Sequence, residues 1–240
     1  MSECKVDEQQ FLSRQSKFWD DISQGWSLQN KNPVVGWYHE HQNFPEYESL
    51  LFRDIPVDNR KDLQVLEYGC GPGRNMIRFR NWFKRMDGID IAPDCIVKAK
   101  VNLADAGVEI PNLWVNDGKS LPMIPNESYD VVFMVISHQH ITNHEVRVNL
   151  YNEFNRVLKP GGFLCFQTGF GPGHPRSVDY FTTDYQNEAE FVDKDVRVEN
   201  VDDLRDDVCG AGFIHKTFTY AFSRTCKDEH PLWIWVSVQK

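Results

Sequence analysis

The 240-residue sequence lacks the features that mark membrane and secreted proteins. No apolar run approaches the ~18 residues that a membrane-spanning helix needs, and the longest, residues 131–136, has the length of a strand. The first residues, MSECKVDEQQ, do not show the basic and then apolar order of a signal peptide. We therefore expect a cytoplasmic protein that contacts no membrane.

The sequence also lacks clustered cysteines and an excess of basic residues. Its six cysteines show neither CxxC nor zinc-ligand spacing, which predicts reduced structural thiols rather than a disulfide framework or a metal site. Acidic residues outnumber basic residues by 35 to 26, and the formal net charge is −9. A surface that binds nucleic acid needs clustered Lys and Arg, so the charge balance argues against a nucleic-acid partner.

Strand and helix signals alternate through the middle of the chain. Apolar residues make up 41% of the sequence, which is enough for the core of one domain with appendages. The alternation predicts an α/β Rossmann-like fold, in which a doubly wound parallel sheet is covered by helices on both faces. The predicted strands are residues 63–67, 86–91, 113–115, 129–136 and 163–168, and the predicted helices between them are residues 75–84, 93–106 and 144–158.

The N-terminal residues 1–60 differ in composition and pattern from the rest of the chain. They are polar, rich in aromatic side chains and broken by Pro and Gly after a helix expected over residues 10–21. This pattern predicts an N-terminal helical lid or appendage. The remaining residues, 61–240, form the predicted main domain.

The C-terminal part of the chain adds two further strands to the predicted sheet. Residues 171–199 are predicted to form a lid-like insertion, and we interpret the acidic run at residues 193–207 as a solvated face. A helix is expected over residues 200–211. Strands at residues 214–222 and 232–238 have no helix between them and should pair antiparallel. The prediction is a seven-stranded sheet, mostly parallel with an antiparallel C-terminal strand.

One stretch, VLEYGCGPGRN at residues 65–75, combines a strand end, a glycine-rich turn and a helix start. Counting G-x-G-x-x-G from Gly69 reaches Gly71 and then Arg74, so the third glycine of a dinucleotide-binding fingerprint is missing. Asp90 ends the second predicted strand, where a carboxylate accepts both ribose hydroxyls of a nucleoside. These features predict a nucleoside cofactor at the carboxyl ends of the strands without deciding which one.

Three further features narrow the choice of cofactor. Glu67 precedes the glycines, Asn116-Asp117-Gly118 follows the third strand, and FNRVLKPGG at residues 154–162 precedes the fifth. In this combination the chain resembles the class I S-adenosylmethionine-dependent methyltransferases, and more closely their small-molecule branch, the type 11 methyltransferases. The resemblance covers residues 63–170 by motif. It implies S-adenosylmethionine as the cofactor and S-adenosylhomocysteine as the product.

The resemblance also implies roles for single residues. Glu67 would orient the ammonium group of the methionine part, Asp90 would hold the ribose, and Asp117 would accept a hydrogen bond from the adenine amino group. Ile91 would pack on the adenine, and the backbone at Ser137 would face the methionine part. The full set of implied cofactor contacts is Glu67, Gly69, Cys70, Gly71, Asp90, Ile91, Asn116, Asp117, Gly118 and Ser137.

The sequence lacks the signatures of several kinds of methyl acceptor. It has no Asn/Asp-Pro-Pro-aromatic run and no Pro-Cys nucleophile after the fourth strand, which argues against the two groups of DNA-methylating enzymes. It also has no acidic pair typical of the catechol-type magnesium site and no paired-glutamate loop typical of protein-arginine methylation. A small-molecule oxygen or nitrogen remains as the expected acceptor.

Two histidines, His138 and His140, follow the fourth strand and are the candidates for a general base, because neutral imidazole near pH 7 suits that task. For each histidine the alternative is a structural role, in which the side chain caps a helix or packs against its neighbours. The predicted acceptor pocket comes from the two lids and comprises Trp37, Tyr38, His41, Phe170, His174 and Arg176.

Two other functions stay open from the sequence. A nicotinamide-dependent oxidoreductase shares the glycine turn and Asp90, and a catalytically silent methyltransferase-like protein would share the whole fold. The sequence indicates neither the identity of the acceptor nor the oligomeric state.

Overall fold

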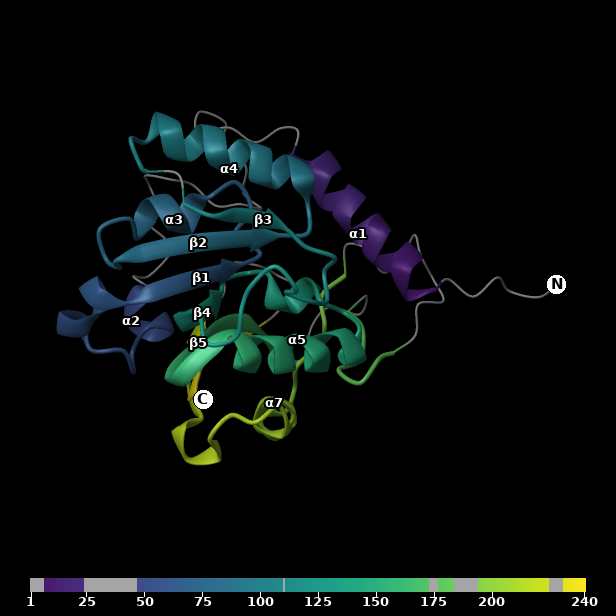
Figure 1. Ribbon diagram of the computed structural model, residues 1–240. Coiled ribbons are helices and arrows are strands. Elements are labelled where there is room, and N and C mark those ends of the chain that lie inside the picture. Colours follow the sequence, from purple (N-terminus) through teal and green to yellow (C-terminus); the bar gives the residue numbers. More distant parts are fainter. Residues whose placement is uncertain (1–6, 24–46, 110, 173–176, 184–193, 225–230) are drawn as a thin grey trace.

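The computed structural model describes residues 7–23, 47–109, 111–172, 177–183, 194–224 and 231–240. Its centre is a single seven-stranded sheet with the strand order β3-β2-β1-β4-β5-β7-β6 (Figure 1). The strands are β1 (Gln64–Tyr68), β2 (Arg85–Asp90), β3 (Leu113–Val115), β4 (Tyr129–Met134), β5 (Leu158–Phe170), β6 (Thr219–Arg224) and β7 (Leu232–Gln239).

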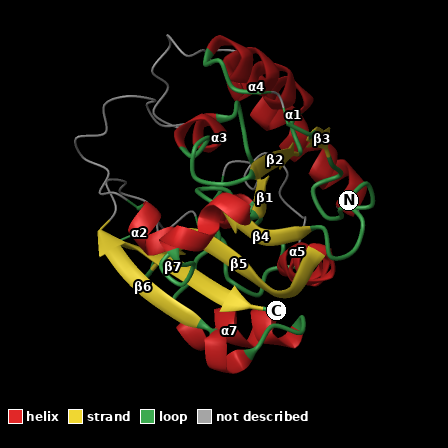
Figure 2. Ribbon diagram, turned by 60° about the vertical axis from the view of Figure 1, so that its left-hand side comes forward, coloured by secondary structure: helices red, strands yellow, loops and turns green. Residues whose placement is uncertain are grey.

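The sheet is parallel from β1 to β5 and antiparallel at its C-terminal edge. β1 pairs with β2 and β4, β2 pairs with β3, and β4 pairs with β5, all in parallel. β7 lies between β5 and β6 and is antiparallel to both, as Figure 2 shows. The predicted seven-stranded, mostly parallel Rossmann-like sheet is confirmed.

The helices begin where the sequence offers suitable caps. Asn143 and Asn200 accept hydrogen bonds from backbone N–H groups at the starts of α5 and α7, and Pro93 opens α4 at a position where its missing N–H costs nothing. The α-helices are α1 (Glu8–Ser23), α2 (Glu48–Leu51), α3 (Arg74–Arg78), α4 (Pro93–Asp105), α5 (His144–Val157) and α7 (Val201–Gly210), and the 3₁₀ turns are η1 (Val57–Asp62), η2 (His138–His140) and η3 (His215–Thr217).

Three predicted boundaries were wrong by five or six residues. The helix expected to reach Lys84 ends at Arg78, because Phe79 and Phe83 turn into the core. The strand expected from Phe163 already begins at Leu158 and runs through the Pro-Gly-Gly stretch. The strand expected from Ile214 begins at Thr219, because η3 occupies the intervening residues.

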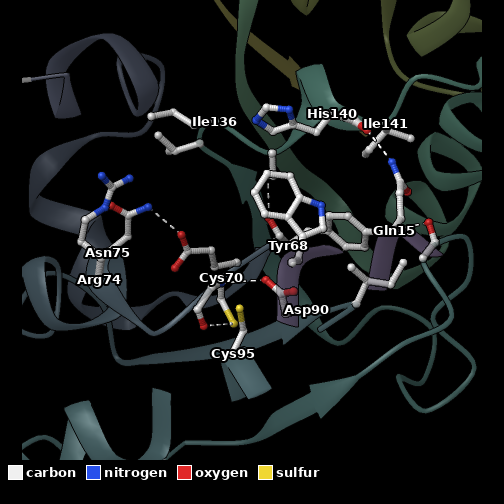
Figure 3. A pocket seen from close by; sticks show the side chains of 18 residues that line it. Gln15, Tyr68, Cys70, Arg74, Asn75, Asp90, Cys95, Ile136, His140 and Ile141 are labelled. Carbon is white, nitrogen blue, oxygen red and sulfur yellow. Dashed lines mark hydrogen bonds between the residues drawn. The ribbon is translucent and has the colours of Figure 1, made fainter. Parts of the chain in front are cut away.

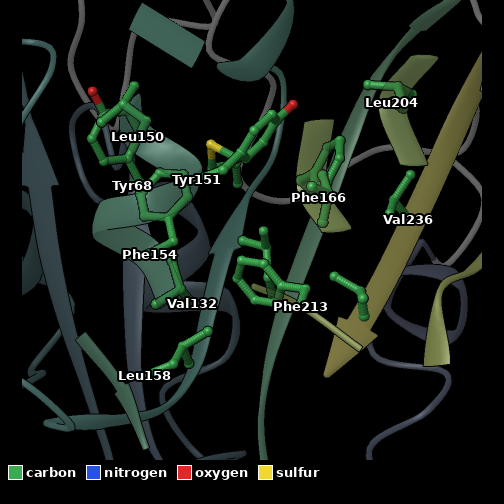
Figure 4. Packing of buried hydrophobic residues seen from close by; sticks show 14 of the residues in the cluster. Tyr68, Val132, Leu150, Tyr151, Phe154, Leu158, Phe166, Leu204, Phe213 and Val236 are labelled. Atoms are coloured by element: carbon green, nitrogen blue, oxygen red, sulfur yellow. The ribbon is translucent and has the colours of Figure 1, made fainter. Parts of the chain in front are cut away.

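Alternating residues of the central strands feed two hydrophobic clusters on opposite faces of the sheet. In β4, Val132 and Met134 face the cluster under α5 and α7, whereas Val131 and Phe133 face the cluster under α2, α3 and α4. Figure 4 shows the first cluster, in which Phe154 of α5 packs beside Val132. A strand buried on both faces reads as a continuous apolar run, which explains the strong signal at residues 131–136.

The helix α1 packs beside the start of α4, near the carboxyl ends of the strands (Figure 1). Ser16 Oγ donates to the carbonyl of Ile91 at 2.8 Å, and the Asp20 carboxylate accepts from the backbone N–H of Asp94 at 2.8 Å. Trp19 packs against Cys95. No helix in the described ranges combines the length and the apolar character that a membrane crossing requires.

Candidate active site

A pocket opens at the carboxyl ends of β1, β2 and β4, where the strand order reverses direction. It holds about 890 Å³ of empty space, its open mouth included. The lining residues come from α1, the end of β1, the glycine loop, the starts of α3 and α4, the end of β2, the loop after β3, the end of β4, and η2 with the residue after it (Figure 3). Ligands of doubly wound sheets bind at such a switch point.

The glycine loop forms the floor of the pocket with a backbone that glycine favours. Gly69, Gly71 and Gly73 all have positive φ angles, of 69°, 51° and 84°. A Cβ on Gly69 would lie 2.5 Å from the Cβ of Ser137, at the end of β4. Only a residue without a side chain fits there, so the backbone of the loop packs directly against the Ser137 side chain.

Glu67 contributes an unsatisfied acceptor to the pocket. Its side chain is buried, and Oε1 accepts a hydrogen bond from Asn75 Nδ2 at 2.6 Å. Asn75 in turn accepts from the Tyr47 hydroxyl at 2.6 Å. Oε2 is buried and has no hydrogen-bond donor among the described residues. Burial raises the pKa of Glu67 to about 8. A cationic donor in the pocket would supply the missing hydrogen bond to Oε2 and would favour the charged form of the Glu67 carboxylate.

Asp90 presents a carboxylate that the backbone holds in place. Oδ2 accepts from the N–H of Gly71 at 2.8 Å, and Oδ1 accepts from the N–H of Ala92 at 2.9 Å. Each oxygen retains a second lone pair for a hydroxyl donor. Burial raises the pKa of Asp90 to about 6, and the two backbone hydrogen bonds work in the opposite direction.

Of the residues predicted to contact the cofactor from the loop after β3, only Gly118 lines the pocket. Gly118 lines the pocket at a φ of +82°, and a Cβ there would lie 2.5 Å from Ile91 Cδ1. Asp117 is exposed and does not line the pocket, because its carboxylate accepts from the N–H groups of Lys119 and Ser120. Asn116 is buried beside the pocket, where its amide donates to the Ser120 carbonyl at 3.3 Å. The roles of Asp117 and Asn116 stay predictions.

Cys70, Ile91 and Ser137 also line the pocket, and their contacts with the cofactor stay predictions. Burial raises the pKa of the Cys70 thiol well above its ordinary value, so this thiol is a packing group rather than a nucleophile. Ser137 Oγ donates to the Tyr68 carbonyl at 3.1 Å and thereby ties the end of β4 to the end of β1.

The two candidate bases lie in different environments, although one residue separates them. His138 is 1% exposed, stacks on Phe166 with ring centroids 4.8 Å apart, and shares a hydrogen bond of 2.6 Å with the Tyr151 hydroxyl. It does not line the pocket, and burial lowers its pKa well below the ordinary value. The expectation that His138 serves as a base is therefore corrected: the residue packs in the core.

His140 lines the pocket. Its Nδ1 lies 2.7 Å from Oδ1 of Asp195, and its ring meets Trp19 edge-on with centroids 4.9 Å apart. Nε2 is buried and has no hydrogen-bond partner in the described part of the chain. Figure 3 shows His140 at the edge of the pocket together with Gln15, whose amide donates to the His140 carbonyl at 2.7 Å.

The predicted acceptor residues are placed only in part. Phe170, at the end of β5, packs against Phe222 with ring centroids 4.8 Å apart and does not line the pocket. The other residues predicted for acceptor binding lie outside the described residues: Trp37, Tyr38, His41, His174 and Arg176.

Sequence reasoning missed several residues at the pocket. Gln15, Trp19 and Asn75 line it, and Asp195 contacts His140. In the sequence, the position of Asn75 just after the glycine loop is the feature that could have indicated a place in the pocket. Asp195 belongs to the acidic run that was interpreted as a solvated face; that interpretation is wrong for Asp195, whose side chain is largely buried.

Comparison with known proteins places the pocket in a recognised domain. Residues 65–162 match the family model described as a methyltransferase domain. A probable methyltransferase, ltbC, from Aspergillus luteorubrus is 29% identical over 133 residues, which cover 52% of this chain and 46% of that protein. Malonyl-(acyl-carrier protein) O-methyltransferase 2 from Ilyobacter polytropus is 30% identical over 113 residues, covering 46% of this chain and 41% of that protein.

A solved structure shares the fold over nearly the whole chain. Phosphoethanolamine N-methyltransferase 2 from Haemonchus contortus, in complex with phosphomonomethylethanolamine and S-adenosylhomocysteine, superposes with a TM-score of 0.66 at 16% identity. The match covers 98% of this chain and 60% of that one. Residues 65–162 therefore resemble a methyltransferase domain, and the chain shares the fold of a solved methyltransferase structure, in agreement with the predicted class I fold. The chain spans about half the length of the curated relatives it matches.

Proposed function

We propose that this chain transfers a methyl group from S-adenosylmethionine to an oxygen or nitrogen of a small-molecule acceptor. The observation that carries the proposal is the meeting of Glu67, Asp90 and His140 around one pocket at the switch point of the sheet. The first two are suited to a cofactor and the third to an acceptor.

The residues of the pocket fit S-adenosylmethionine. The ammonium group of its methionine part is the kind of donor that the buried Glu67 Oε2 lacks. The carboxylate of Asp90 has lone pairs left for the two ribose hydroxyls. Gly69 lines the floor of the pocket and contributes no side chain to it. S-adenosylmethionine, when bound, would supply a methyl group attached to a cationic sulfur. A nucleophile can attack this methyl group, with the sulfur as the leaving group.

The residues of the chain would then hold and deprotonate the acceptor. His140 Nε2 is a proton acceptor without a partner in the described residues. Ile136, Ile141 and Trp19 give this part of the pocket an apolar wall that excludes water. Holding the nucleophile in line with the methyl group accounts for much of the rate enhancement expected of such an enzyme.

The two lids belong to the proposal as well. Residues 1–60 serve as an N-terminal lid on a main domain of residues 61–240, with a second lid at about residues 171–199. The contacts of Gln15 and Trp19 with His140 support the first lid, and the contact of Asp195 with His140 supports the second. Trp37, Tyr38, His41, His174 and Arg176 remain the proposed acceptor-binding residues, whereas Phe170 packs against Phe222 outside the pocket.

An assay with methyl-labelled S-adenosylmethionine tests the proposed acceptor class. The protein is incubated with separate pools of small amines, phenols and carboxylic acids, and in parallel with DNA, RNA and denatured peptides. We expect protein-dependent transfer of label into at least one small-molecule pool and none into the macromolecules. Label found only in a macromolecular pool would overturn the small-molecule acceptor, and no transfer to any pool despite tight cofactor binding would favour the catalytically silent alternative.

A further inference from the structure

A histidine–aspartate pair lies at the edge of the pocket. His140 is the last residue of η2, which follows β4, and Asp195 lies in the segment between β5 and α7. Their closest atoms, Nδ1 and Oδ1, are 2.7 Å apart, and their side chains are only 14% and 9% exposed. Two elements distant in the sequence thus bring an imidazole and a carboxylate together in one buried pair, at a distance typical of an ion pair.

The position of Asp195 is fixed by backbone pairing rather than by its side chain alone. Val196 forms a parallel bridge with Val178, and the N–H of Val178 donates to the Asp195 carbonyl at 3.0 Å. The N–H of Val196 donates to the carbonyl of Gln139, in η2, at 2.7 Å. The Gln139 side-chain amide also donates to Asp195 Oδ2 at 3.2 Å, which leaves Oδ1 directed at the histidine.

The histidine ring is held on its remaining sides by α1. Trp19 meets the ring edge-on at 61°, and Gln15 bonds the His140 carbonyl. Of the two ring nitrogens, Nδ1 lies 2.7 Å from Asp195 Oδ1 without the alignment of a hydrogen bond, and Nε2 has no polar partner in the described residues. An ionised carboxylate can only accept a hydrogen bond, so a ring that turns to bond Asp195 would carry the proton on Nδ1 and the lone pair on Nε2.

We infer that Asp195 is a positioning residue that fixes His140 in the tautomer able to take a proton from the methyl acceptor. The inference rests on the proposed function. As the acceptor oxygen or nitrogen forms its bond to the methyl group, its proton passes to His140 Nε2. The bond between methyl and sulfur breaks, and its electron pair stays on sulfur. The resulting imidazolium is paired with the Asp195 carboxylate until its proton returns to water.

The chain offers a matched control for this pair. His144 Nε2 lies 2.9 Å from Asp207 Oδ2, with side-chain exposures of 20% and 14%. This second pair joins α5 to α7, and neither residue lines the pocket. Asp207 also accepts from the Tyr180 hydroxyl at 2.6 Å. Asp207→Asn therefore disturbs a pair of similar chemistry and burial without reaching the proposed base.

The first test is the tautomer of His140, read from ¹⁵N spectra of the histidine side chains in the full chain at alkaline pH, where imidazole rings are neutral. The His140 signal is assigned by its loss in His140→Gln. We expect a single Nδ1–H tautomer in the wild type and in Asp207→Asn, and a tautomer mixture in Asp195→Ala. A wild-type Nε2–H tautomer, or no change in Asp195→Ala, would overturn the inference. The wild-type spectrum alone decides the tautomer even where a variant fails to fold.

The second test is turnover of an acceptor that the wild type methylates. Asp195→Asn should lower kcat by about 10²-fold or more, because an amide also supports the wrong tautomer, while the affinity for S-adenosylhomocysteine stays within about threefold. Asp195→Glu should recover part of the loss, and Asp207→Asn should keep kcat. Equal losses of kcat in Asp195→Asn and Asp207→Asn would show that the role of Asp195 is structural and would overturn the inference. If the wild type binds no S-adenosylhomocysteine, the proposed function fails, and the spectra still decide the Asp195 contact.

Discussion

Gly69 and Ser137 approach so closely that a Cβ on Gly69 would lie 2.5 Å from the Cβ of Ser137. The contact joins the end of β1 to the end of β4 and closes the floor of the pocket between them. The glycine at this position is therefore required by the space available as well as by its φ angle of 69°.

The two requirements can be separated with a second glycine. Gly107 has a φ of +66°, but an added Cβ would meet nothing within 4 Å. Gly107→Ala should cost about 1 kcal/mol of unfolding free energy through its backbone alone. Gly69→Ala should cost 1–3 kcal/mol more, on the order of an overpacked core, and should weaken binding of S-adenosylhomocysteine at least about tenfold. Denaturant unfolding and calorimetry measure both, and equal effects of the two changes would contradict the close approach.

Asp90 is expected to hold the cofactor through a carboxylate already anchored to two backbone N–H groups. Asp90→Asn replaces one acceptor oxygen by a donor and removes the charge. The dissociation constant for S-adenosylhomocysteine should rise about tenfold or more, since hydrogen bonds to charged groups contribute ~1.5–3 kcal/mol. Asp94→Asn, at an exposed residue outside the pocket, should leave it unchanged. Unaltered affinity in Asp90→Asn would remove Asp90 from the site.

Glu67 should make the stability of the ligand-free protein depend on pH. Burial raises its pKa from 4.5 to about 8, so between these values the folded state keeps a proton that the unfolded state releases. The contribution of Glu67 to the unfolding free energy is therefore full below about pH 4.5 and is lost as the pH rises towards 8. The slope approaches at most ~1.4 kcal/mol per pH unit.

Glu67→Gln removes this proton and isolates the effect. The unfolding free energy of the variant minus that of the wild type should increase steadily from pH 5 to pH 8. Denaturant titrations at several pH values give this difference, in which the titration of groups that do not interact with Glu67 cancels. A difference that stays constant with pH would show that Glu67 is ionised in the folded protein throughout.

His138 and His140 should respond oppositely to replacement. His138→Ala removes a buried ring stacked on Phe166 and should cost about 2–4 kcal/mol of stability, with kcat within about threefold of the wild type below the melting temperature. His140→Ala should lower kcat by about 10²-fold or more at unchanged affinity for S-adenosylhomocysteine. Thermal melts and single-turnover rates separate the two, and a large kcat loss in His138→Ala would contradict its assignment to the core.

Much of the fold, and the meeting of the glycine loop and Asp90 at one pocket, could be predicted because the signals are local. The apolar run of β4 reports a strand buried on both faces, and the glycine loop and Asp90 lie at the ends of adjacent strands. A parallel sheet brings such strand ends to one edge whatever the intervening sequence. Gly118 and Ile91 line the pocket because they follow β3 and β2, whose carboxyl ends lie at the same edge of the sheet.

The acceptor side could not be predicted, because it depends on contacts between distant segments. Asp195 reads as one carboxylate in an acidic run, and only the pairing of Val196 with Gln139 turns it towards His140. His138 and His140 look equivalent in sequence, but the η2 turn directs one into the core and the other to the pocket. The early end of α3 is likewise a tertiary effect, in which burial of Phe79 and Phe83 outweighs helix propensity.

Calorimetric titration of the protein with S-adenosylhomocysteine and, separately, with NAD tests the central claim most directly. The account predicts one site for S-adenosylhomocysteine with a dissociation constant in the micromolar range or below, weakened in Asp90→Asn, and no measurable heat with NAD. Binding of NAD without binding of S-adenosylhomocysteine would contradict the account and restore the oxidoreductase alternative.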